Sequence, residues 1–121
     1  MDKKSQLKKE YKQKIRPAGV YQIVNKINGK VLVGRSSNLD GRFNSHNFML
    51  RYGSHRNKEL QKDWNELGEE NFKFEVLELI NPDDETITDY PSELSIMEEL
   101  WLEKLQPYGE RGYNKKSVRK E

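Results

Sequence analysis

The chain has 121 residues, of which 35% are charged and 33% hydrophobic, and its formal net charge is +2. This length predicts a single domain, and the large apolar residues are clustered enough for one small core. The absence of cysteine excludes disulfides, zinc–thiolate sites and thiol nucleophiles. Because there is neither an apolar run of about 20 residues nor a secretory leader, we expect no membrane contact and a cytoplasmic location.

The charges are segregated along the chain. Residues 1–16 carry seven basic and two acidic residues, and residues 104–121 carry six basic and two acidic residues. Residues 66–103 contain thirteen acidic residues and one lysine. Basic ends around an acidic third favour contact with a polyanion through one face, although a basic terminus alone is more often a solvated tail. The charge distribution is compatible with nucleic-acid binding. The alternative is an interaction domain that uses its acidic third as the surface for a partner.

The residue patterns predict an α+β domain. The expected elements, in chain order, are a short helix within 3–14, strands over 19–25 and 30–34, helices over 38–50 and 56–67, a strand over 72–77, an acidic loop over 81–91 and a helix from about 92 to 105. Asn38 is the expected N-cap of the second of these helices. This order predicts a small three-stranded antiparallel sheet flanked by helices.

The first two strands form a predicted hairpin. Asn28-Gly29 is typical of a two-residue turn, which sets Asn25 opposite Leu32. Side chains alternate along a strand, so one face of this hairpin is expected to carry Tyr21, Ile23, Leu32 and Gly34.

Several polar residues have the chemistry of a phosphodiester-cleaving site. Glu98 lies within the apolar arc of the last helix, so it must be paired, metal-bound or at the rim of a cleft. Arg42 and His46 are one helical turn apart, so their side chains can converge; an ordinary exposed pair is the alternative. His55 lies in a turn, where most histidines are at the surface. Hydrolysis needs a cation on a carboxylate, a base such as Tyr21 or His46, and a guanidinium.

Five short motifs, taken together, resemble the GIY-YIG nuclease family. They are Gly19-Val20-Tyr21, Leu32-Val33-Gly34, Arg42 with His46, Glu98, and Gly112-Tyr113-Asn114. The stretch over residues 53–64 is also similar to the intron-homing endonucleases of that family. On this basis we interpret residues 1–17 as a basic extension, 18–114 as the nuclease domain and 115–121 as a basic tail.

The resemblance implies metal-dependent cleavage of DNA, with roles that follow the motifs. Tyr21 would activate or orient the attacking water, Arg42 would bind the scissile phosphate, and His46 would assist proton transfer. Glu98 would hold one divalent cation, Mg²⁺ or Mn²⁺. Further expected contacts to phosphate or DNA are Arg35 and His55, and the expected supporting residues are Gly19, Leu32, Gly34 and Asn114. The DNA target and the oligomeric state are left open.

One position departs from the family pattern. The second motif normally opens with tyrosine, and Leu32 occupies that position. On the expected hairpin, Leu32 faces the same side as Tyr21 and fills the space without a hydroxyl. We therefore expect a DNA endonuclease of reduced activity. The alternative is a catalytically inactive nucleic-acid-binding module on the same fold.

Overall fold

The structure, a computed structural model, describes residues 17–116. Its elements are β1 Gly19–Asn25, β2 Val31–Ser36, α2 Leu39–Arg51, α3 Lys58–Leu67, β3 Phe72–Leu79 and α4 Tyr90–Leu105, with short 3₁₀ turns at Glu69–Asn71 and Gly109–Arg111. The strands form one antiparallel sheet in the order β2-β1-β3. The predicted α+β class with a three-stranded sheet is confirmed. The helix expected within residues 3–14 lies outside the described residues.

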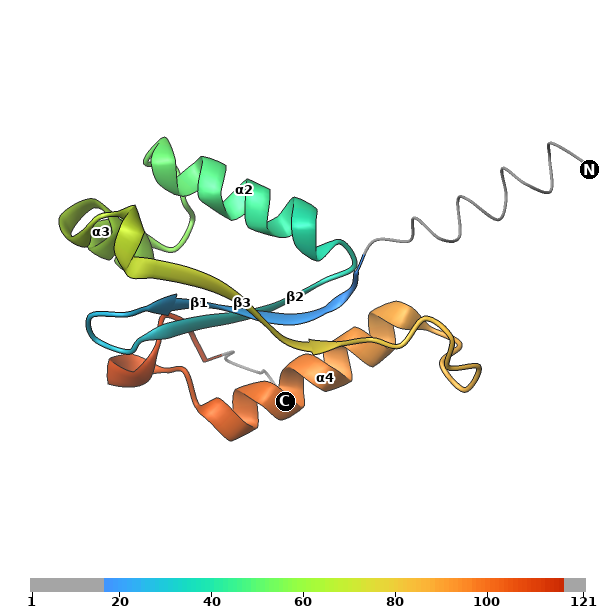
Figure 1. Ribbon diagram of the computed structural model, residues 1–121. Coiled ribbons are helices and arrows are strands. Elements are labelled where there is room, and N and C mark those ends of the chain that lie inside the picture. Colours follow the sequence, from blue (N-terminus) through green and yellow to red (C-terminus); the bar gives the residue numbers. More distant parts are fainter. Residues whose placement is uncertain (1–16, 117–121) are drawn as a thin grey trace, which may run out of the picture.

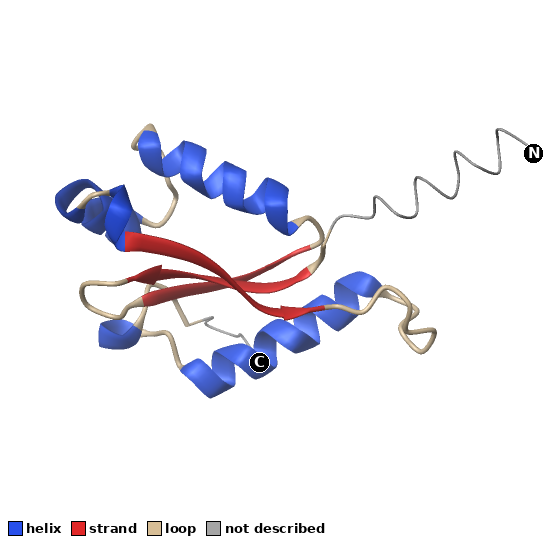
Figure 2. Ribbon diagram, viewed as in Figure 1, coloured by secondary structure: helices blue, strands red, loops and turns tan. Residues whose placement is uncertain are grey.

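Helices cover both faces of the sheet, with α2 and α3 on one face and α4 on the other (Figure 1 and Figure 2). The central strand β1 is therefore buried on both sides. Tyr21 and Ile23 pack in one cluster with residues of α2 and α3, and Val20 packs in the other with Leu94 and Met97 of α4. The side chains of β1 thus alternate between the two apolar clusters.

The β1–β2 hairpin has a different register from the predicted one. Leu32 pairs with Ile23, and Gly34 pairs with Tyr21, so the prediction that Asn25 lies opposite Leu32 is wrong. The displacement is two residues along the strand. Because side chains alternate with a period of two, the predicted face of the hairpin is preserved.

The shift is caused by the side chain of Asn25. Its Oδ1 accepts hydrogen bonds from the main-chain N–H of Ile27, at 2.9 Å, and of Asn28, at 3.4 Å. The main-chain N–H of Asn25 donates to the carbonyl oxygen of Lys30 at 2.8 Å. The side-chain bonds form a local turn, which lengthens the loop to residues 26–29. Gly29, with φ of 79°, takes the left-handed position in that loop.

The helices begin where polar side chains cap them. Asn38 caps α2 as predicted, because its side chain accepts from the main-chain N–H three residues ahead. The same bond made by Asn57 starts α3 two residues later than the predicted Arg56, and Asp89 starts α4 before the predicted Ser92. Within residues 17–116, no helix has the length and apolar character needed to cross a membrane.

Candidate active site

A buried chain of three side chains links three separate elements. The hydroxyl of Tyr21 on β1 lies 2.7 Å from Nε2 of His46 on α2. Nδ1 of His46 lies 2.8 Å from Nε2 of His55, in the loop between α2 and α3. The exposed fractions are 5% for Tyr21, 7% for His46 and 4% for His55. The fold thus brings a phenol and two imidazoles into one continuous hydrogen-bonded row beneath the surface.

The structure buries His55, which was expected to contact phosphate or DNA. His55 is buried, its Nε2 faces His46, and its Nδ1 accepts from the main-chain N–H of Asn57 at 3.0 Å. Both ring nitrogens are therefore occupied inside the protein. The main-chain N–H of His55 also donates to Oε1 of Gln61 at 3.0 Å. Gln61 was missed by sequence reasoning. It directly follows Leu60 on α3, and a polar residue beside the apolar stripe of a helix is a signal of such a partner.

Burial keeps all three groups of the chain neutral near neutral pH. It raises the pKa of Tyr21 to about 12, while the positive charge of Arg42 lowers this value and the negative charge of Glu98 raises it. Burial, with smaller contributions from His55 and Arg42, lowers the pKa of His46 to about 4. Burial also lowers the pKa of His55. The charges of Arg42 and Glu98 both act on the phenol of Tyr21.

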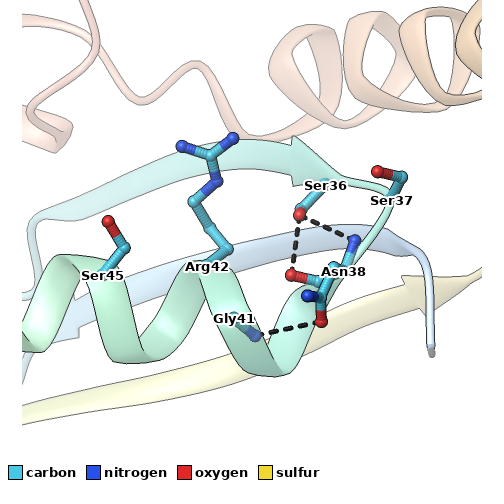
Figure 3. A pocket seen from close by; sticks show the side chains of 6 residues that line it. All are labelled: Ser36, Ser37, Asn38, Gly41, Arg42 and Ser45. Atoms are coloured by element: carbon cyan, nitrogen blue, oxygen red, sulfur yellow. Dashed lines mark hydrogen bonds between the residues drawn. The ribbon is translucent and has the colours of Figure 1, made fainter.

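Arg42 is at the edge of an open hollow. The hollow has a volume of about 330 Å³ and is lined by Ser36, Ser37, Asn38, Gly41, Arg42 and Ser45. Figure 3 shows the guanidinium of Arg42 extending from α2 near the end of β2, with the serine and asparagine side chains of the β2–α2 connection beside it. A guanidinium, hydroxyls and an amide are the donors with which proteins bind phosphate. The arrangement is chemically suited to one phosphate of a nucleic-acid backbone.

Glu98 approaches the site from α4, on the opposite face of the sheet. One oxygen of its carboxylate accepts from Nη1 of Arg35 on β2 at 2.5 Å. The side chain of Glu98 is 20% exposed and that of Arg35 is 45% exposed. Arg35 was expected to contact phosphate, and in this structure its guanidinium is paired with Glu98 instead. The pair joins the edge strand β2 to α4.

Glu98 has the chemistry of a divalent-cation ligand. Within the described residues 17–116, no group of three or more histidine, aspartate or glutamate side chains is arranged to enclose a metal ion. Mg²⁺ is often held by one or two carboxylates together with water and substrate phosphate, so it does not need such an enclosure. A half-buried carboxylate such as that of Glu98 fits that type of site, provided that Arg35 releases it.

Comparison with known proteins identifies the fold. The family model of the GIY-YIG catalytic domain matches residues 17–114. The chain belongs to the GIY-YIG family. Among solved structures, it is similar to the catalytic domain of the homing endonuclease I-TevI, with 28% identity over 83% of this chain and 99% of that chain and a TM-score of 0.67. A glutamate-to-alanine mutant of the same intron endonuclease domain matches over 81% and 92%, with 28% identity and a TM-score of 0.66. No curated protein sequence gives a match.

The predicted resemblance to GIY-YIG nucleases is therefore confirmed, and the domain has the fold of a nuclease. The glycines of the two GIY-YIG motif segments are required by close approach of other atoms. A Cβ on Gly34 would lie 2.5 Å from the hydroxyl oxygen of Tyr21, so this glycine lets the phenol lie across the edge strand. A Cβ on Gly19 would overlap the carbonyl oxygen of Glu78 on β3, next to an irregularity in the β1–β3 pairing.

The last GIY-YIG motif braces the edge strand. The side-chain amide of Asn114 accepts from the main-chain N–H of Val33 at 2.8 Å and donates to the carbonyl oxygen of the same residue at 2.9 Å. The main-chain N–H of Tyr113 donates to the carbonyl oxygen of Val31 at 2.9 Å. These bonds cover the outer edge of β2 as an additional strand would. Asn114 thereby holds the strand that carries Gly34 in place.

Leu32 lies where this chain departs from the GIY-YIG pattern. It is half-buried and packs against the apolar cluster that contains Tyr21. Leucine therefore contributes packing to the site side of the sheet and supplies no hydroxyl.

Proposed function

We propose that this GIY-YIG domain is a divalent-metal-dependent DNA endonuclease that hydrolyses phosphodiester bonds. The observation that supports it most directly is the convergence around Tyr21. The phenol is hydrogen-bonded to His46 and lies within the electrostatic reach of both Arg42 and Glu98. A phenol, a guanidinium and a carboxylate are the parts that phosphodiester hydrolysis needs.

In the proposed reaction, a water oxygen bonds to phosphorus while the bond from phosphorus to one sugar oxygen breaks. Tyr21 orients the water and accepts its proton once the phenol is ionised. Arg42 donates to the phosphoryl oxygens, whose negative charge grows as the water attacks. When bound at Glu98, a divalent cation would polarise the phosphate and lower the pKa of a coordinated water. The leaving sugar oxygen takes its proton from solvent.

The state of Tyr21 in the free domain explains why these partners are needed. Burial raises the pKa of its phenol to about 12, so the group is protonated near neutral pH. Positive charge favours the phenolate. Arg42 supplies one such charge, and a cation at Glu98 would supply more. We therefore infer that the phenolate form of Tyr21 depends on positive charge near it, which Arg42 supplies and to which a cation held by Glu98 would add.

Two features favour the inactive nucleic-acid-binding module as the second candidate. Leu32 removes one phenol from the site, and Arg35 occupies the carboxylate that should hold the cation. A module of this kind binds DNA with an affinity that falls steeply with salt, because phosphate contacts release counterions. It leaves the DNA strands intact with any metal.

The decisive experiment is a nicking assay on supercoiled plasmid with Mg²⁺ or Mn²⁺. We expect cleavage by the unmodified protein, its loss in Glu98→Gln, and its retention in Glu103→Gln, an exposed carboxylate of the same helix. Equal nicking by all three proteins would indicate a contaminating nuclease and overturn the assignment. If none cuts but the protein binds DNA, a Leu32→Tyr variant that gains cleavage identifies the inactive module.

A further inference from the structure

The hydrogen bonds around His55 have a fixed direction. The main-chain N–H of Asn57 can only donate, and it points at Nδ1 of His55 at 3.0 Å. Nδ1 of His55 must therefore present a lone pair. A neutral imidazole carries its one proton on the other nitrogen, so the proton of His55 is on Nε2.

The proton position on His55 fixes the direction of the other two hydrogen bonds in the row. Nε2–H of His55 faces Nδ1 of His46 at 2.8 Å, so Nδ1 of His46 accepts. The proton of His46 is then on Nε2, which lies 2.7 Å from the hydroxyl oxygen of Tyr21. In the opposite direction, Nδ1–H of His55 would face the N–H of Asn57, and two hydrogens would meet inside the protein. That arrangement is excluded for neutral rings.

We infer that the main-chain amide of Asn57 sets the tautomers of both histidines, so that His46 donates a hydrogen bond to Tyr21 and the phenolic proton of Tyr21 points out into the site. His55 and Asn57 are positioning residues in this scheme, since they act on Tyr21 only through His46. Burial, which lowers the pKa of both imidazoles, supports the neutral rings that the scheme requires. The hydroxyl of Tyr21 makes no other hydrogen bond within residues 17–116.

The catalytic consequence rests on the proposed function. Tyr21 releases its outward proton to solvent when the site is assembled, and the donated hydrogen bond from Nε2 of His46 stabilises the resulting phenolate. The phenolate then takes one proton from the attacking water. Both imidazoles keep their own protons throughout, so His46 is a hydrogen-bond donor to the base rather than a base itself. This replaces the expectation that His46 transfers a proton.

The tautomers can be measured directly on the free protein. The chain has two histidines, so long-range ¹H–¹⁵N correlation spectra of the ¹⁵N-labelled protein near pH 7 contain two imidazole patterns. We expect both rings to be protonated at Nε2 and unprotonated at Nδ1. An Nδ1–H pattern for either ring, or fast exchange between tautomers, would overturn the inference. The measurement uses no metal and no DNA.

A pair of variants at position 55 tests the effect on Tyr21. In His55→Gln the amide nitrogen can still donate toward Nδ1 of His46, whereas His55→Phe offers no donor. We expect the Nε2–H tautomer of His46 to persist in the glutamine variant and to lose its dominance in the phenylalanine variant. Nicking should fall about tenfold to a hundredfold in His55→Phe, the usual effect of losing a hydrogen bond that supports a charged group, and recover in His55→Gln.

The outcomes separate this inference from the proposed function. If the plasmid is never cut, the nuclease proposal is refuted. If both histidines are nevertheless protonated at Nε2, the direction of the hydrogen bonds from Asn57 to Tyr21 is still established. The positioning role is overturned if folded His55→Phe cuts DNA at the rate of the unmodified protein and its His46 tautomer is unchanged. Should His55→Phe fail to fold, as circular dichroism will show, the spectrum of the unmodified protein decides alone.

Discussion

Protonation of His46 is expected to destabilise the domain at mildly acidic pH. In the folded protein, burial lowers the pKa of His46 to about 4. In the unfolded chain, the imidazole has an ordinary pKa of about 6.5. Between these two values the unfolded chain binds more protons than the folded protein. Lowering the pH through this window therefore favours unfolding.

The size of the effect follows from the two pKa values. The side chain is 7% exposed, so solvent screening of the shift is small. Between about pH 7 and about pH 5, the linkage relation gives a loss of about 2 kcal/mol in the free energy of unfolding. The loss continues until the pH falls below the folded-state value near 4. Most carboxylates are still ionised at about pH 5, so the window is favourable for observing a histidine.

Urea denaturation followed by circular dichroism at the two pH values measures this loss. A His46→Gln variant is the matched control, because its amide can still donate to Tyr21 but does not titrate. We expect the unmodified protein to lose about 2 kcal/mol more than the variant over this range. Equal losses in both proteins would refute the assignment of a buried, neutral imidazole to His46.

Three further substitutions test other contacts of the site. Gly34→Ala would place a methyl group 2.5 Å from the hydroxyl of Tyr21. Because this misplaces a reacting group slightly, we expect kcat for nicking to fall about a hundredfold with DNA affinity unchanged. An unaffected kcat would contradict this expectation. Arg35→Gln frees the carboxylate of Glu98. Since an exposed ion pair contributes at most about 1 kcal/mol, calorimetry on the DNA-free domain should show Mn²⁺ bound up to about fivefold more tightly. Weaker Mn²⁺ binding would show that the guanidinium assists the metal. Asn114→Ala leaves two main-chain groups of β2 without partners; the free energy of unfolding should fall by about 1–3 kcal/mol, and an unchanged urea midpoint would refute the bracing role.

Local patterns predicted the elements because their causes are local. Asn38 caps α2 through a bond to the N–H three residues ahead, which depends only on neighbouring sequence. The faces of the first hairpin were predicted for a similar reason, since alternation survives an even shift of register. The register of the hairpin was not predicted, because the side chain of Asn25 competes with the β1–β2 hydrogen bonds for main-chain N–H groups.

The candidate site was only partly accessible to sequence reasoning. Tyr21, Arg42, His46 and Glu98 were selected by their chemical type and by their match to family motifs. The burial of His55 was not predicted, because a histidine in a Gly-Ser-His turn resembles a surface residue until α3 covers it. Gln61, which holds the main chain of that turn, was missed for the same reason.

By itself, the amino-acid sequence determined the order of strands and helices, the sheet face that carries Tyr21, and the family motifs. Only the tertiary structure decided that Arg35 pairs with Glu98, 63 residues away, and that His55 is buried against His46. The physical reason is the range of the interactions. Periodicity and capping act within a few residues, whereas ion pairs and buried hydrogen bonds depend on which distant surfaces the packing of the core brings together.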